Sequence, residues 1–122
     1  MEITTLNHKG KEILYLNFSY GDMLDKRQEV LSLIEEAKSY IAKQTPHSLL
    51  TLTNVTGLRF SMELVNTIKE FSIHNQPFVK AASIVGITGI QKIAYDTVIR
   101  ITKRNIPVFP SVEEAMDWLV EQ

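Results

Sequence analysis

The chain has 122 residues, a formal net charge of −1, 44% hydrophobic residues and 22% charged residues. These values are typical of one globular domain with its own core, and they argue against disorder and against generic nucleic-acid binding. The chain contains no cysteine, which excludes disulfides, thiolate metal ligands and a cysteine nucleophile.

No segment of the sequence has the pattern of a leader or a membrane anchor. Residues 1–18, MEITTLNHKGKEILYLNF, lack a basic segment followed by an apolar run, so a signal peptide is not expected. No run of 18 apolar residues occurs, so we expect no membrane span. The absence of cysteine fits a reducing compartment. The expected location is the cytoplasm.

Residues 3–8 and 12–19 flank the short turn Lys9-Gly10 and are predicted to form a β-hairpin. Glycine in the turn can adopt a positive φ angle at no steric cost. Alternation in the second run places three apolar side chains on one face of the strand, which are Leu14, Leu16 and Phe18.

A long helix is predicted after the hairpin. Asp22 is placed to cap its N-terminus, the helix runs to about Lys43, and Pro46 cannot continue it. Glutamates lie off its apolar stripe, as expected for a helix with one solvated face. The stripe consists of Met23, Val30, Ile34, Ala37 and Ile41.

Residues 48–55 are apolar on both faces, which indicates a buried central strand. Gly57 ends this strand, and Ser61 is placed to cap a second helix that stops at Asn75 and Pro77. The predicted buried face of this helix consists of Leu64, Val65, Ile68, Phe71 and Ser72.

A second buried strand is predicted over 81–86, and a third helix runs from Thr88-Gly89 to about Lys103. Its predicted stripe is Ile90, Ile93, Ala94, Val98 and Ile101. Further apolar residues lie elsewhere on its circumference, namely Ile87, Tyr95 and Ile99. A helix that is apolar all round is buried in a core or in a partner, so two interpretations of the third helix are open. It forms a dimer or ligand surface, or it is buried beneath the edge of the sheet.

The last strand is predicted over 106–109, where Pro107 lacks an amide proton and therefore favours a sheet edge or a strand start. Ser111 and Glu114 form a capping box for a terminal helix. Its inward residues are predicted to be Ala115, Met116, Trp118 and Leu119.

The order β-β-α-β-α-β-α-β-α predicts a single α/β domain over residues 1–122. We expect a mixed five-stranded sheet that begins with the N-terminal β-hairpin, is parallel in its centre and is covered by four helices. No linker or repeat divides the chain.

Charge is unevenly distributed near the C-terminus. Residues 80–104 carry five basic side chains and one acidic one, for a net charge of +4, whereas the four acidic residues of 113–121 give −4. Two interpretations are open: the two segments are neighbours that offset each other, or the first is a functional basic patch.

Three histidines are the obvious catalytic candidates, but none lies four residues from another, so no helical metal-ligand pair is formed. We expect His8, His47 and His74 to be solvated turn and helix-end residues.

Other catalytic patterns are also lacking. Glu35-Glu36 and Glu113-Glu114 are adjacent pairs that would not face one another on a helix. No G-x-S-x-G elbow, Walker loop or G-x-G-x-x-G motif occurs. We therefore expect no enzyme, no catalytic residue, no metal and no cofactor.

Two strand-to-helix loops hold the candidate binding residues. Gly86, Thr88, Gly89 and Ile90 lie at a glycine-containing turn whose amides and helix N-terminus suit a phosphate or carboxylate, although two glycines also make an ordinary tight turn. In the other loop, the candidates are Thr56, Arg59 and Ser61. Ser61 is a candidate phosphorylation site or an ordinary N-cap.

The whole pattern resembles small bacterial STAS-like proteins. The resemblance rests on the hairpin, the long first helix, the strand 49–55 leading through Thr56-Gly57 to a helix, the strand-turn 82–89 and the closing FPSVEEA. That group shares the fold of anti-sigma factor antagonists and is classed with CRAL-TRIO-like lipid-binding domains. Antagonist-like members act by protein–protein contact and carry a phosphorylatable serine, which Ser61 matches best. The family's usual Asp-Ser pair is absent, because Phe60 precedes Ser61.

The leading hypothesis is a non-enzymatic regulatory or protein-interaction module of STAS-like fold. It would bind an unidentified protein partner through residues 56–61, residues 86–90 and the third helix. The alternative is a small carrier that holds an amphipathic or anionic small molecule at the same edge. Homodimerisation is compatible with both, and nucleic acid is not an expected partner.

Overall fold

The computed structural model describes residues 1–20, 27–59 and 61–122. The predicted cap Asp22 and the stripe residue Met23 lie outside this range. The strands are β1 (Glu2–His8), β2 (Lys11–Asn17), β3 (Leu49–Asn54), β4 (Val79–Val85) and β5 (Val108–Phe109). The helices are α1 (Arg27–Ile41), α2 (Met62–Asn75), α3 (Ile90–Thr102) and α4 (Val112–Val120).

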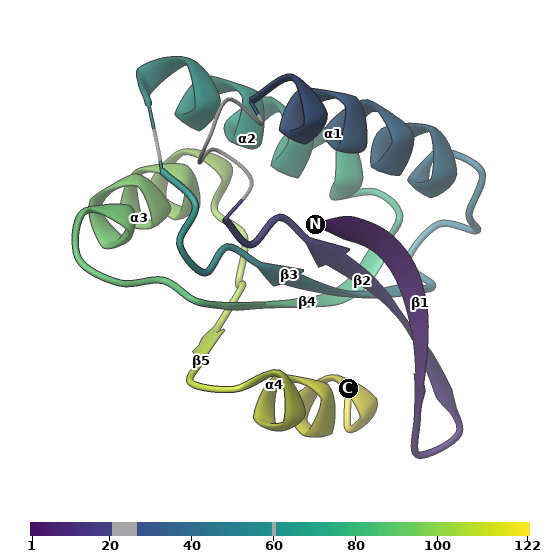
Figure 1. The fold of residues 1–122 in the computed structure, drawn as a ribbon. Coiled ribbons are helices and arrows are strands. Elements are labelled where there is room, and N and C mark those ends of the chain that lie inside the picture. The colour runs from purple at the N-terminus through teal and green to yellow at the C-terminus, as the bar shows by residue number, and fades with distance from the viewer. Residues whose placement is uncertain (21–26, 60) are drawn as a thin grey trace.

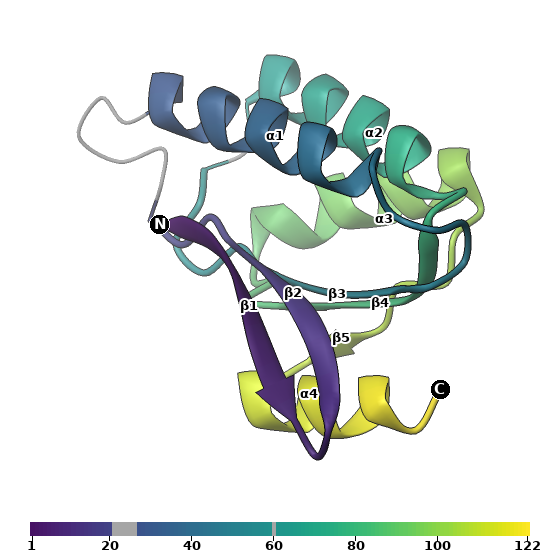
Figure 2. The same cartoon turned by 90° about the vertical axis from the view of Figure 1, so that its right-hand side faces the viewer.

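The sheet has the order β1-β2-β3-β4-β5, with β1 antiparallel to β2 and all other pairs parallel. Parallel crossovers are right-handed, and this order never reverses, so all three crossover helices must cover the same face. Figures 1 and 2 show α1, α2 and α3 on one side of the sheet and α4 on the other. The predicted fold class is confirmed.

The hairpin turn forms where it was predicted, with both Lys9 and Gly10 at positive φ angles of 49° and 82°. Two such residues make the tight turn whose twist matches that of the flanking strands. In β2, Leu14 and Leu16 face the three crossover helices, whereas Ile13 belongs to the cluster that contains α4. Strand β2 is therefore buried on both faces, not on one.

The face covered by α1, α2 and α3 is called the three-helix face. The predicted stripe of α1 is confirmed at its described positions. At the start of α2, the Ser61 hydroxyl accepts a hydrogen bond from the Leu64 amide at 3.2 Å, which confirms the predicted cap. Leu64, Phe71 and Ser72 are buried as predicted, but Val65 and Ile68 are only half-buried.

The opposite face, the α4 face, is covered by one short helix. Ala115 and Leu119 are fully buried there, against Ile13, Leu52 and Val85 among others. The predicted capping box is half formed: the Ser111 hydroxyl accepts from the Glu114 amide at 3.2 Å. Within the described residues the reciprocal bond from the Ser111 amide to the Glu114 side chain is not made.

The predicted stripe of α3 is confirmed at Val98, which is buried, but it is wrong at Ile93 and Ile101, which are 69% and 52% exposed. Gln91, which was not part of the predicted stripe, is buried instead. Because apolar residues also lie outside the predicted stripe, periodicity alone could not fix the rotation of this helix, which depends on the hydrogen bonds of Gln91. The last strand is also shorter than predicted, with only two residues, and it lies at the sheet edge as Pro107 indicated.

The first interpretation of the charges is confirmed only in part, because α4 and β4 are neighbours but their charged side chains pair elsewhere. Asp117 contacts His8 Nε2 at 2.7 Å and Lys9 Nζ at 3.1 Å, which joins the hairpin turn to α4. Lys92 pairs with Asp96 on its own helix. Within the described residues, no ion pair joins 80–104 to 113–121.

Candidate functional site

The loops that follow β3 and β4, residues 55–59 and 86–89, are called the carboxyl-edge loops. Parallel strands end at the same edge of a sheet, so these loops lie side by side (Figure 1). Gly86 has a φ angle of 91°, and a Cβ atom there would overlap the amide and hydroxyl of Thr56. Any larger residue at position 86 would clash with the neighbouring loop, so glycine is required there.

The polar groups of Thr56 are used within the chain. Its amide and its hydroxyl both donate to Asn54 Oδ1, at 3.0 and 2.7 Å. Asn54 in turn donates from Nδ2 to the Tyr15 hydroxyl at 2.9 Å. This network fixes the loop after β3. Neither Thr56 donor remains for an anion.

Gln91 is a buried polar anchor between the two loops, which the sequence pattern did not predict. It is 8% exposed, and its Nε2 donates to the carbonyl oxygens of Val55, at 3.0 Å, and Leu58. Its Oε1 accepts from the Thr88 amide at 3.0 Å. Gln91 therefore locks the two carboxyl-edge loops together and turns α3 so that Ile93 faces outward. The available signal was a lone amide side chain early in an otherwise apolar helix.

The remaining predicted site residues have different environments. Arg59 is exposed, while Ser61 is half-buried at the start of α2. Glu63, in the first turn of α2, forms an ion pair with Arg27 of α1. A phosphate on Ser61 would gain from the helix dipole but would stand close to the carboxylate of Glu63 in the same turn. The structure describes the backbone at Ile90 but not the burial of its side chain.

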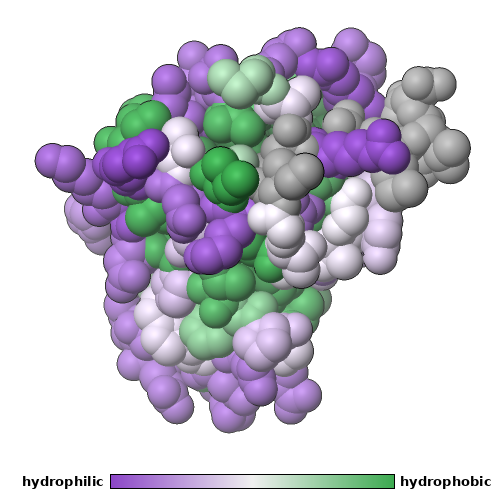
Figure 3. Space-filling model, turned by 90° about the vertical axis from the view of Figure 1, so that its left-hand side faces the viewer, coloured by the Kyte–Doolittle hydropathy of each residue, from purple (hydrophilic) through white to green (hydrophobic). Residues whose placement is uncertain are grey.

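An apolar surface borders the carboxyl-edge loops. Met62 is 80% exposed at the start of α2, and Ile93 is 69% exposed in the first turn of α3. Figure 3 shows apolar patches set among polar side chains on the side of the molecule that carries α3. Exposed large apolar side chains in such groups are typical of contact surfaces.

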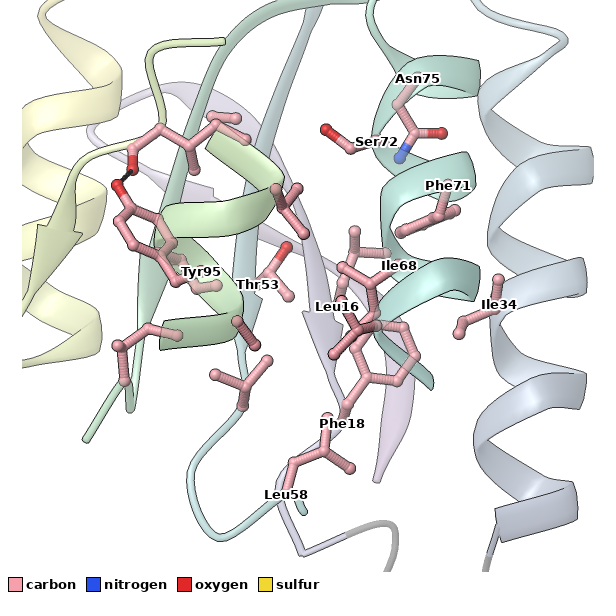
Figure 4. A pocket seen from close by; sticks show the side chains of 18 of the residues that line it. Leu16, Phe18, Ile34, Thr53, Leu58, Ile68, Phe71, Ser72, Asn75 and Tyr95 are labelled. Carbon is pink, nitrogen blue, oxygen red and sulfur yellow. Dashed lines mark hydrogen bonds between the residues drawn. The ribbon is translucent and has the colours of Figure 1, made fainter. Parts of the chain in front are cut away.

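A second feature lies beneath the helices: an apolar cavity of about 100 Å³ between α2, α3 and the sheet. Figure 4 shows Phe18 and Leu58 at one end of it and Ser72 and Asn75 at the other, where α2 ends. From the α3 side, the walls include Ala94, Tyr95, Val98 and Ile99. The backbone of α3 lies close to that of α2, and the cavity lies between these two helices and the strands.

The end of the cavity near Ser72 is polar. The Arg104 guanidinium donates from Nη1 to both the carbonyl and the hydroxyl oxygen of Ser72, at 3.1 Å each. Burial lowers the pKa of Arg104 from its ordinary value, although arginine stays charged. The Tyr95 hydroxyl donates to the Ile106 carbonyl, and its pKa is raised, first by burial and then by Asp96.

The three histidines lie apart. His47 is exposed as predicted, but His8 and His74 are half-buried, because His8 bonds to Asp117 and His74 Nδ1 lies 2.9 Å from Asn75 Oδ1. In the part of the chain that the structure describes, no three acidic or histidine side chains could hold a metal ion together. In the same part, no helix combines the length and the apolar character that a membrane crossing needs.

No protein-family model, curated protein or solved structure matches the chain.

Proposed function

We propose that this protein is a non-enzymatic regulatory or protein-interaction module of STAS-like fold. The observation that carries the proposal is the apolar surface of Met62 and Ile93 beside the carboxyl-edge loops. These loops are rigidly joined through Gln91 and the Gly86–Thr56 contact. A preorganised apolar surface loses little conformational entropy on association, which favours binding.

The strand order β1-β2-β3-β4-β5 and the single antiparallel hairpin also support the proposed fold group, because they agree with the element order on which the resemblance rests. Ser61 caps the helix after the central strand, which is the position that the resemblance implies for regulation. Its hydroxyl oxygen accepts from the Leu64 amide, so a modified Ser61 would alter the start of α2 directly.

The carrier alternative at this edge has less support. In a sheet whose order does not reverse, neighbouring loops do not open the crevice that holds ligands in doubly wound folds. The Thr88 amide, one of the groups that would bind an anion there, already donates to Gln91. The space suited to a small molecule lies instead beneath α2 and α3.

The interaction surface is tested by replacing Ile93 with arginine. Chemical cross-linking in the host cell, followed by mass spectrometry, should give a cross-linked partner for the wild-type chain that Ile93→Arg loses. Ile73→Arg is the matched control, because Ile73 is also exposed but lies near the opposite end of α2. Loss with both variants, or with neither, contradicts a contact through this surface.

The regulatory part of the proposal is tested at Ser61. We expect Ser61→Glu to weaken the same cross-link while Ser61→Asn, which keeps an N-cap acceptor without a charge, preserves it. Equal cross-linking by both variants would exclude control by charge at Ser61. Circular dichroism of each variant confirms that the domain stays folded.

A further inference from the structure

A hollow separate from the cavity beneath α2 and α3 lies along the outer side of β4, near the end of this strand that is farther from the carboxyl-edge loops. Strand β5 pairs with β4 only at Ile84 and Val85. The first half of β4 therefore has no described strand partner on its outer side. A hollow of about 310 Å³ lies along this edge. We call it the basic hollow, because its lining includes Lys80, Lys103 and Arg104 and no Asp or Glu side chain.

Among the described residues that line this hollow, three carry cationic side chains and none is an Asp or a Glu, so the side chains create a local positive potential in a chain of net charge −1. Within the described residues, none of the three forms an ion pair. The acidic residue that could have approached from α4, Asp117, is held by His8 and Lys9 instead. The charge pattern of the sequence thus leaves a basic surface here.

Arg104 has N–H donors that its hydrogen bonds to Ser72 do not use. Its bonds to Ser72 tie the segment after α3 to the last turn of α2, and this structural role uses Nη1 only. A guanidinium carries five N–H donors in a planar fork. The remaining donors are suited to a planar anion such as a carboxylate, which accepts two parallel bonds from one guanidinium.

Arg104 also connects the two spaces. Both Arg104 and Ala82 line the basic hollow and the apolar cavity beneath α2 and α3. The cavity beyond them is lined mainly by aliphatic and aromatic side chains, with Ser72 and Asn75 at the end near Arg104 (Figure 4). A cation therefore stands at the junction of a basic surface and an apolar interior.

We propose that this junction is a binding site for a small amphipathic anion, a short-chain carboxylic acid. Its carboxylate would bind Arg104 in the basic hollow, and its apolar group would enter the cavity. The size class follows from the volume, because an apolar cavity of about 150 Å³ holds benzene and this cavity is somewhat smaller. The site is independent of the protein-interaction surface proposed above.

Hexanoate is the probe for this site. A titration followed by two-dimensional NMR should give saturable shifts for the wild-type chain. Hexanol, which lacks the charge, and inorganic phosphate, which lacks the apolar chain, should each bind at least about tenfold more weakly. Absence of saturable hexanoate shifts overturns the proposal. So does equal affinity for hexanol or for phosphate, since each would make one half of the site irrelevant.

Two variants separate the two halves. Arg104→Gln should weaken hexanoate by about tenfold, and Arg100→Gln, an exposed arginine on α3 that lines neither space, should not. Ala94→Leu fills the cavity and should weaken hexanoate while keeping every cation. Unchanged affinity in Arg104→Gln or Ala94→Leu contradicts the site. Lys103→Gln, which keeps the Ser72 contacts of Arg104, should weaken hexanoate by a smaller factor even if Arg104→Gln fails to fold.

Discussion

The two faces of the sheet are covered by helices in different ways. On the α4 face, one short helix places Ala115 and Leu119 in full burial against strands β3 and β4. On the three-helix face, an apolar cavity of about 100 Å³ lies between α2, α3 and the strands. The α4 face is closely packed at these residues, whereas the three-helix face has both room for a ligand and exposed apolar side chains. We therefore expect the two faces to respond differently to substitution.

The largest difference should come from truncating one side chain on each face. Leu119→Ala should lower the free energy of unfolding by about 3 kcal/mol, because it removes a fully buried side chain and leaves a void. Ile99→Ala should cost about 1 kcal/mol, since Ile99 is half-buried and already borders a cavity. Urea unfolding measures both values. Equal losses of unfolding free energy in the two variants would mean that the two faces of the sheet are packed equally closely.

Enlarging an alanine on each face tests the same comparison from the other direction. Ala115→Leu should cost about 1–3 kcal/mol of stability, because there is no space for the added atoms. Ala94→Leu should be tolerated or should raise the melting temperature, because the new atoms enter the cavity. Differential scanning calorimetry of the pair decides the point. Destabilisation by both variants would contradict an open space beneath α3.

A buried hydroxyl offers a smaller effect. Ser83 Oγ is fully buried on β4 without a hydrogen-bond partner in the described residues. Alternation along the strand places it on the α4 face with Ala81 and Val85. Ser83→Ala should raise the free energy of unfolding by about 0.5–1 kcal/mol, because an unpaired buried hydroxyl is unfavourable. A loss of stability in urea unfolding would show that the hydroxyl has a role on this face.

The smallest effect concerns the exposed link between the hairpin turn and α4. The hydrogen bond from His8, followed by that from Lys9, lowers the pKa of Asp117. A carboxyl group with a lowered folded-state pKa stabilises the fold above its unfolded pKa of about 3.9 and loses this contribution as the pH falls through the folded value. Asp117→Asn should thus be slightly less stable than the wild type at pH 7 and equal to it at strongly acidic pH. A difference that persists in acid would rule out this linkage.

The fold could be predicted from the sequence because its signals are local. Lys9-Gly10 specifies a tight turn, Ser61 and Ser111 each cap a helix, and the doubly apolar run over 48–55 becomes the buried strand β3. Each of these signals is set by residues within a few positions of one another, so no tertiary knowledge is needed.

The candidate sites could be predicted only in part. The loops 55–59 and 86–89 meet as expected, because parallel strands end at one edge. The rotation of α3 was missed, since it depends on Gln91 reaching two carbonyl groups more than thirty residues earlier in the chain. The junction at Arg104 was missed for the same reason: Ser72, Lys80 and Arg104 come together only through the packing of α2, β4 and the segment after α3.

The difference between the two faces is tested most directly by amide hydrogen exchange, measured with and without hexanoate. In the free protein, the amides of α3 should exchange faster than those of α4, because α3 covers an unfilled cavity. Hexanoate should slow exchange in α2 and α3 more than in α4, because α4 borders only the basic hollow, through Trp118. Two results would contradict the proposed difference, in which the three-helix face is loosely packed and binds the ligand and the α4 face is closely packed. One is that α4 exchanges as fast as α3, and the other is that hexanoate protects both faces equally.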